Sequence, residues 1–252
     1  MHYRSRHEAL IGFSNAHYYD SRLQPVPEHP CHAARAPLYE HRTAGVYEDR
    51  TNRKETAEAV ELIADLLAAE NSPSIGVACF NLSQRHAILD AFDAKCAANE
   101  GFARRLEAAR TRHWKDSFEG LFVKNLENVQ ADKRDVMIIS TTFGPDAGGK
   151  FRRNFGALSQ QDGGHRLNAL IIRARQAVHV FTSILPEEYA SVPEAPPGMI
   201  PGGRLQLYAY LRYAESLASA AATPPEGVPA LTVRSTATPL PVAVVYWGHN
   251  RF

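Results

Sequence analysis

The sequence predicts an α/β fold in which a mostly parallel central sheet carries helices on both faces. Short runs of apolar, partly β-branched residues alternate along the chain with longer segments whose apolar residues recur at helical spacing. The short runs lack the polar alternation of a half-exposed sheet. Each run is therefore expected to be buried on both faces, as in a parallel sheet covered by helices.

Composition sets only broad limits on function. The chain has 252 residues, 44% hydrophobic and 22% charged, which is ordinary for a globular domain with a sizeable core. A net charge of +1 neither indicates nor excludes a nucleic-acid partner, because grooves depend on local charge. Cys31, Cys79 and Cys96 fit no zinc motif and indicate a reduced, cytoplasmic setting. No apolar run suggests a membrane span, so no membrane partner is expected.

The first half of the chain predicts three helices and one strand. A short helical face (residues 9–13) precedes a proline-rich loop that reaches Pro37. Residues 51–70 form a strong amphipathic helix, with Asn52 as its cap and Glu55 as the partner carboxylate. A buried strand (74–80) and a helix (82–98) that Ser83 would cap follow it.

The second half predicts three strands and three helices. The expected elements are a basic helix (102–116), strands at 121–130 and 135–143, a helix (163–176), a strand (178–184) and an amphipathic helix (204–222). The expected organisation is one domain over residues 1–190, a linker with a trailing helix over 191–222, and an unassigned tail from 223. In a parallel sheet, ligands bind beyond the carboxyl ends of the strands, so chemistry is expected in the loops there.

One glycine-rich segment matches the spacing of a phosphate-binding loop. Gly144 to Lys150 fits G-x-x-x-x-G-K after a buried strand. Phe151 follows where a magnesium-binding hydroxyl is needed, and Pro145 removes a backbone donor. An exposed loop is therefore the favoured interpretation. The alternative is a small self-contained nucleotide-binding enzyme that uses this loop.

Three polar clusters are the other candidates for chemistry. A dense polar block (125–135) separates two strands, and it is either a solvated turn or a binding segment. Arg166 and Arg173 are seven residues apart, so the predicted helix would place them on one face suited to phosphate, unless that face is simply solvated. Tyr3 and Arg4 could hold a nucleotide by stacking and charge, or belong to an unstructured start.

Four blocks in sequence order resemble the second motor domain of superfamily 1 helicases, in the branch of the Upf-type helicases and their large bacterial relatives. The blocks are HYRSRHEALIGFSNAHYYDSRL, IGVACFNLSQRHAI with Gln84, LFVKNLENVQADKRDVMIISTTFGPD, and NFGALSQQDGGHRLNALIIRARQAVHVFTS. A later segment, RLQLYAYLRYAE, resembles one that follows the motor in the bacterial branch, and the resemblance covers about residues 1–215. It implies a RecA-like three-layer domain.

The resemblance also implies roles for individual residues. Tyr3 would stack near the adenine of ATP, Arg4 would approach its γ-phosphate, and Gln130 with Lys133 would face the nucleotide. Arg173 would be the arginine finger that stabilises charge during phosphoryl transfer. The strand contacts would come from Asn125, Ser140 and Arg166. The expected partners are a single strand of DNA or RNA and a first RecA-like motor domain, which would supply the phosphate loop and hold ATP with Mg²⁺.

Several positions depart from the family pattern. Ala131 replaces a glycine, Lys133 replaces a glutamate that touches the sugar, His165 replaces an arginine and Ile172 replaces a threonine. These changes favour an alternative function, a degenerate copy that binds nucleic acid or protein without catalysis. The basic segment that contains Trp114 would then be the binding surface, with Arg104, Arg105, Arg110, Arg112 and Lys115.

Overall fold

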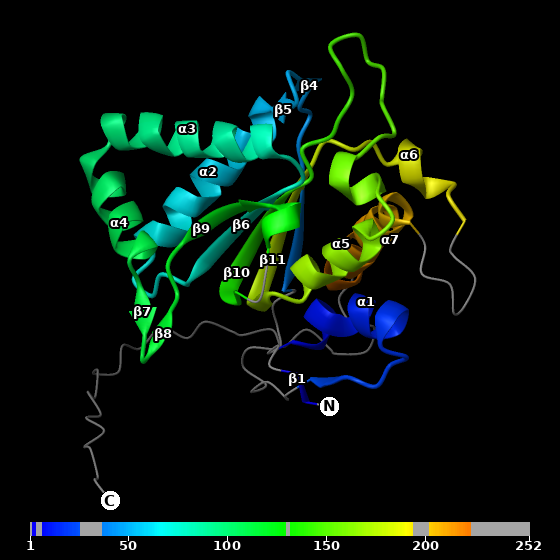
Figure 1. Ribbon diagram of the computed structural model, residues 1–252, viewed down its shortest axis with the longest axis horizontal. Helices are drawn as coiled ribbons and strands as arrows, with labels where there is room; N and C mark the ends of the chain where they lie inside the picture. Colours follow the sequence, from blue (N-terminus) through cyan, green and yellow to red (C-terminus); the bar gives the residue numbers. More distant parts are fainter. Residues whose placement is uncertain (1, 4–6, 26–36, 130–131, 194–201, 223–252) are drawn as a thin grey trace, which may run out of the picture. The chain divides into compact units, whose positions relative to one another are not determined.

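The architecture is known from a computed structural model, which describes residues 2–3, 7–25, 37–129, 132–193 and 202–222 (Figure 1). Five strands form the central sheet, in the order β3-β11-β10-β6-β9, and every neighbouring pair is parallel. Their bounds are β3 (Leu38–Arg42), β6 (Ile75–Cys79), β9 (Phe122–Asn125), β10 (Arg134–Ser140) and β11 (Ala174–Thr182). The prediction of a mostly parallel sheet is confirmed.

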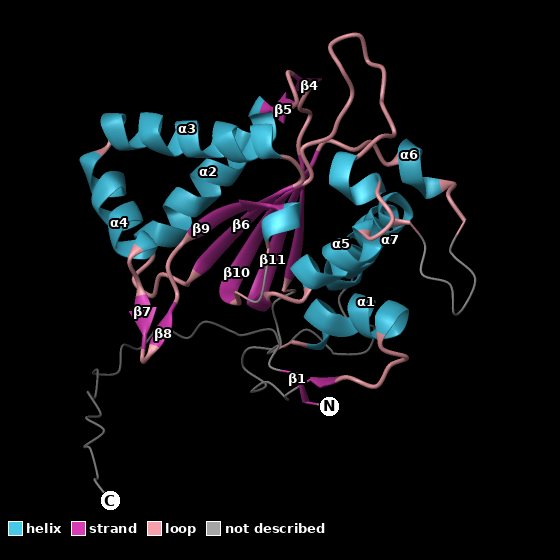
Figure 2. Cartoon of the chain, in the orientation of Figure 1, coloured by secondary structure: helices cyan, strands magenta, loops and turns pink. Residues whose placement is uncertain are grey.

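Helices cover both faces of this sheet (Figure 2). One layer contains α2 (Arg53–Ala68), α3 (Leu82–Ala98) and α4 (Glu100–Arg110). The opposite layer contains α1 (Glu8–Tyr18), α5 (Gly163–Ile171) and α7 (Gly203–Ala222). Along β10, Val136 and Ile138 belong to the core under the first layer, whereas Met137 and Ile139 belong to the core under the second. The three-layer arrangement therefore follows from strands that are apolar on both sides, and it is consistent with a RecA-like fold.

Helix α7 packs into the main body of the fold. It contacts α5 and β3 and buries Leu207, Tyr208 and Leu211 in the core. A side chain at Gly163 or Gly203 would overlap the carbonyl oxygen of Leu158, so both glycines allow close approach of the backbones. The segment expected to be a trailing helix thus forms one compact unit with the sheet. The predicted tail after residue 222 lies outside the described residues.

Short elements complete the described chain. Three two-stranded pairs are β1 (His2–Tyr3) with β2 (Gln24–Pro25), β4 (Tyr47–Glu48) with β5 (Thr51–Asn52), and β7 (His113–Trp114) with β8 (Ser117–Phe118). The remaining helical segments are η1 (Leu126–Asn128), η2 (Gly156–Ser159) and α6 (Glu187–Ala190).

The sequence prediction differs from the fold at several places, of which four bear on the site. Strand β3 was not predicted, and the basic helix ends at Arg110, after which the chain forms the β7–β8 hairpin. Asn81, rather than Ser83, caps α3. The helix predicted to reach residue 176 ends at Ile171, so Arg173 does not share a helix face with Arg166. The carbonyl of Arg173 instead accepts a hydrogen bond from the amide of Arg134. The chain therefore pairs with β10 from this point and continues as strand β11.

Candidate functional site

The candidate residues gather at the two opposite edges of the parallel sheet. The amino edge is where β10 and β11 begin, and the carboxyl edge is where they end. Lys133 immediately precedes β10 and Arg173 immediately precedes β11, so both lie at the amino edge. These two candidates therefore lie at the edge opposite to the one where the strand topology predicts ligand binding, and their roles stay predictions.

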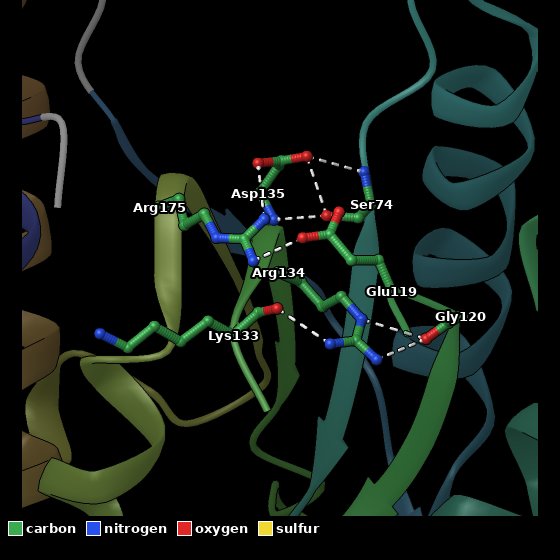
Figure 3. Close-up of polar contacts among 7 residues, drawn as sticks. All are labelled: Ser74, Glu119, Gly120, Lys133, Arg134, Asp135 and Arg175. Atoms are coloured by element: carbon green, nitrogen blue, oxygen red, sulfur yellow. Dashed lines mark hydrogen bonds and ion pairs between the residues drawn. The ribbon is translucent and has the colours of Figure 1, made fainter. Parts of the chain in front are cut away.

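A network of ion pairs and hydrogen bonds fixes the amino edge (Figure 3). The Arg134 side chain is almost fully buried, and its Nε and Nη2 donate to the carbonyl oxygen of Gly120 at 3.0 and 2.8 Å. Arg175 pairs with Glu119 at 2.6 Å and with Asp135 at 3.4 Å. The amide and hydroxyl of Ser74 both donate to Asp135, at 3.1 and 2.8 Å.

Two aspartates of this edge, Asp132 and Asp135, have pKa values below the ordinary range. Burial alone would raise the pKa of Asp135, but the donors from Ser74 and the neighbouring Arg175 outweigh it and hold that pKa below its ordinary value. The pKa of Asp132 is also lowered, first by a hydrogen bond from Lys124 at 2.7 Å and further by the charges of Arg134 and Arg173. The amino edge is thus strongly ionic at neutral pH.

Arg173 differs from the two paired arginines beside it. Its backbone is fixed, because its amide donates to the carbonyl of Leu170 and its carbonyl accepts from Arg134. Its side chain is partly exposed, yet its Nε is buried and has no hydrogen-bond partner among the described residues. A buried guanidinium nitrogen without a partner costs free energy unless another molecule completes it. The geometry therefore leaves Arg173 able to accept an anionic ligand.

Other residues expected to bind nucleotide are only partly described. Figure 3 shows the Lys133 side chain extending away from the ion-pair network, while its carbonyl accepts from Arg134 at 2.9 Å. The backbone of Tyr3 lies in β1, and its side chain is outside the described atoms. Arg4 and Gln130, like Ala131, lie outside the described residues, so the convergence of Arg4 with Arg173 stays a prediction.

A buried carboxylate organises the carboxyl edge. Glu55, in the first turn of α2, is fully buried. It accepts hydrogen bonds from the Ser140 hydroxyl at 2.6 Å, the Thr142 amide at 2.8 Å and the Ser183 amide at 2.9 Å. Burial raises the pKa of Glu55 to about 7, and these hydrogen bonds oppose the rise. One side chain thus joins the ends of β10 and β11 to α2.

A cleft of about 800 Å³ opens above this buried network. The β4–β5 hairpin forms one wall, and the loop after β10 forms the other. The Tyr47 amide donates to the carbonyl of Pro145 at 2.8 Å, which joins the two walls. The cleft combines aromatic rings with basic and acidic side chains, and its lining includes Tyr47, Phe143, Arg50, Lys150, Arg152, Asp49 and Asp146.

The segment that matches a phosphate-loop pattern forms a closed turn at this cleft. The carboxylate of Asp146 accepts the amides of Gly148 at 3.0 Å and Lys150 at 2.9 Å. These are donors that a phosphate-binding loop would offer to its ligand. Phe151 bridges back to Pro145, and the next α-helix begins only at Gly163. The geometry supports the interpretation of this segment as an exposed turn.

The three residues expected to contact a strand occupy two different environments. Ser140 is fully buried, where it donates to Glu55 and accepts from Gln84, and its contact with a strand stays a prediction. Asn125 and Arg166 converge on Glu127. The Asn125 Nδ2 lies 3.2 Å from one Glu127 oxygen, and the Arg166 Nη1 lies 3.8 Å from the other. Asn125 is also mostly buried, so Arg166 is the more accessible of this pair.

Sequence reasoning missed most of the cleft. Glu55 was treated only as part of a helix cap, and Arg50, Tyr47 and Arg152 were not singled out. One signal was present, since hydroxyl residues lie at the ends of two buried strands, at Ser140–Thr142 and at Thr182–Ser183. Such polar clusters at strand ends need a buried partner. The described residues contain no group of His, Cys, Asp or Glu suited to a metal ion, and none of their helices has the length and apolarity to cross a bilayer.

Comparison with known proteins adds two curated relatives. The uncharacterized ATP-dependent helicase MG140 of Mycoplasma genitalium is 31% identical over 222 residues, which cover 86% of this chain and 18% of the relative. Its homolog in Mycoplasma pneumoniae is 29% identical over 227 residues, covering 87% and 18%. The chain is thus related to proteins named as helicases and spans about a fifth of their length. No family model matches the chain.

The solved structures add no argument. The crystal structure of the plantazolicin methyltransferase BpumL, in complex with a desmethylPZN analog and SAH, aligns with 69% of this chain and 65% of its own, at 12% identity. Its TM-score of 0.27 is too low to indicate a common fold.

Proposed function

We propose that this chain is the second motor domain of an ATP-dependent superfamily 1 helicase, acting on a single strand of DNA or RNA. A first RecA-like motor domain would supply the phosphate-binding loop and the Mg²⁺ ligands. This chain would supply the arginine finger, Arg173, from the amino edge of its sheet. The relationship to proteins named ATP-dependent helicases supports the proposal, as does the order of the four motif blocks.

One observation carries the nucleotide half of the proposal. Among the three arginines beside the starts of β10 and β11, Arg134 and Arg175 are bound to protein groups, whereas Arg173 keeps a buried Nε without a partner among the described residues. An arginine finger must be held by its backbone and free at its guanidinium, because it acts only when a transferring phosphoryl group arrives. Arg173 has the fixed backbone, and its Nε is unpaired among the described residues.

The strand half of the proposal rests on the carboxyl-edge cleft. Arg50, Lys150 and Arg152 can neutralise backbone phosphates, and Tyr47 can stack against a base. Asp49 and Asp146 also line the cleft, but the three cations outnumber these two carboxylates. Nucleotide and strand would therefore bind at opposite edges of the same sheet, and closure of the two motor domains would couple them.

The experiment that tests the proposal is an assay of strand-stimulated ATP hydrolysis. The full chain is mixed with a first motor domain that bears a phosphate-binding loop. Arg173→Ala should lower the turnover rate by about a thousandfold and leave strand binding intact. Arg22→Ala is the matched control, because the Arg22 side chain is exposed and has no assigned role in binding. Unchanged hydrolysis in Arg173→Ala would exclude the finger role. Strand binding without any hydrolysis would favour the degenerate, non-catalytic copy that Lys133 suggests.

A further inference from the structure

The loop after β10 contains a strained residue at the entrance to the cleft. Thr142 has a φ of +70°. A β-branched side chain in this left-handed region is a genuine outlier, since its branches crowd the backbone. Such strain persists only where the surrounding structure holds it, and it often accompanies function. The next two residues, Phe143 and Gly144, line the cleft.

The Glu55 carboxylate is the group that holds Thr142 in this conformation. The Thr142 amide donates to its Oε2 at 2.8 Å, and the Thr141 hydroxyl lies 3.4 Å from its Oε1. Ser140 and Ser183 supply two further donors. The Asn52 side chain adds a fifth at 3.3 Å. These neighbours all donate to Glu55, so the ionised carboxylate satisfies the whole set.

The same carboxylate reaches both walls of the cleft. Asn52 donates to Ser183 at 2.8 Å and pairs with Tyr47 across the β4–β5 hairpin. A Cβ at Gly144 would meet Ser183 at 2.9 Å and the Asn52 side chain at 3.5 Å, so the loop packs directly on this network. Glu55 is therefore connected to both walls, to one through Thr142 and to the other through Asn52, although it is buried beneath the cleft.

We propose that Glu55 is a positioning residue, whose buried carboxylate holds the Thr142 turn and thereby sets the shape in which the cleft grips a single strand. The proposal rests on the strand-binding half of the proposed function. Glu55 touches no ligand in this scheme. It acts through its hydrogen bonds to Thr142 and Asn52, which position the residues that line the cleft.

The test measures strand affinity with fluorescein-labelled oligothymidylate and oligouridylate by fluorescence anisotropy, using the full chain. Glu55→Gln keeps the size of the side chain but turns one acceptor into a donor facing donors. Affinity should fall about tenfold. Glu58→Gln is the matched control, because Glu58 lies on the same helix and enters none of the hydrogen bonds around Glu55. Its affinity should equal that of the wild type.

A second substitution separates positioning from a general loss of stability. Thr142→Gly removes the steric cost of a positive φ, since glycine adopts that region readily. The double variant Glu55→Gln/Thr142→Gly should therefore recover most of the lost affinity, and it carries the test if the single variant does not fold. Wild-type binding with equal affinity in a folded Glu55→Gln variant would overturn the inference alone. Absence of strand binding by the wild type would overturn the strand half of the proposed function as well.

The pH dependence of strand affinity distinguishes the positioning role from a purely structural one, which would not make affinity depend on the protonation of Glu55. The groups that face Glu55 from α2, β10 and the loop after β11 are amides and hydroxyls, which do not titrate near neutrality. The nearby Cys79 thiol stays neutral, because burial first and the charge of Glu55 second raise its pKa. Wild-type affinity should fall as pH drops through about 7, where Glu55 takes up a proton. The profile of Glu55→Gln should be flat, and identical profiles would overturn the inference.

Discussion

The two edges of the central sheet differ in how their buried charged groups are paired. At the carboxyl edge, one buried carboxylate is surrounded by five protein donors, and the ligand-accessible cleft lies above it. At the amino edge, several ion pairs surround one arginine whose Nε has no described partner. The carboxylate at the first edge is paired within this chain, whereas at the second edge the buried Arg173 Nε is unpaired among the described residues. Under the proposed function, the first edge would bind a strand within this chain alone, and the second would bind nucleotide together with a first motor domain.

The largest expected effect tests whether Arg173 really differs from its paired neighbour. Arg134→Ala should lower the free energy of unfolding by about 3 kcal/mol, because the Gly120 carbonyl loses its donors and Phe122 loses the cation packed on its ring. Arg173→Ala should change it by less than about 0.5 kcal/mol. Urea denaturation followed by circular dichroism measures both. Equal losses would make Arg173 a structural residue and remove the contrast between them.

The next effect tests the buried network of the carboxyl edge. Asn52 and Asn99 cap α2 and α4 in the same way, each accepting an amide three residues later. Asn52 also donates to Ser183 and Glu55. Asn52→Ala should therefore cost about 2 kcal/mol of unfolding free energy, and Asn99→Ala about 1 kcal/mol. Thermal unfolding of both variants gives the difference, and equal costs would mean that the network adds nothing beyond a helix cap.

The fold was largely readable from the sequence, and particular elements explain why. The strands β6 and β10 are short apolar runs buried on both faces, and α2 has an apolar stripe with a cap, so local pattern and tertiary environment agree. Strand β3 was missed because LYEHR has no apolar run, and it becomes a strand only through its pairing with β11. The end of α5 was missed for a related reason, since the periodicity continues past Ile171 while sheet pairing takes over the backbone.

The candidate site was less readable than the fold. The sequence supplied Arg173 and Lys133 as candidates, but it placed Arg173 on a helix face rather than at the start of a strand. It also offered Ser140 as a strand contact, although the Ser140 side chain lies beneath the cleft. The cleft residues Tyr47, Arg50 and Arg152 come from two loops about a hundred residues apart in the chain, and only the tertiary fold brings them together. A local sequence pattern cannot predict that residues from two such distant loops line one cleft.

The acid sensitivity of the amino edge is the third test. The folded-state pKa of Asp135 is lowered, because its hydrogen bonds from Ser74 and the charge of Arg175 outweigh burial. Its contribution to stability is therefore present above its unfolded pKa of about 4 and is lost as pH falls through the lower folded value. Unfolding titrations at several acidic pH values should show a shallower loss for Asp135→Asn than for the wild type. Parallel curves would show that Asp135 does not stabilise this edge.

The smallest expected effect is on the salt dependence of nucleic-acid binding, and it tests which edge of the sheet binds the single strand. Each phosphate that a cation neutralises on a single strand adds about 0.7 to the slope of the logarithm of affinity against the logarithm of salt concentration. Arg152→Ala removes a cation of the cleft, so the slope should fall by about that amount, with only a modest loss of affinity at low salt. Arg173→Ala, at the opposite edge, should leave the slope unchanged. If Arg173→Ala lowered the slope and Arg152→Ala did not, the strand would lie along the amino edge, and the assignment of strand and nucleotide to separate edges would have to be reversed.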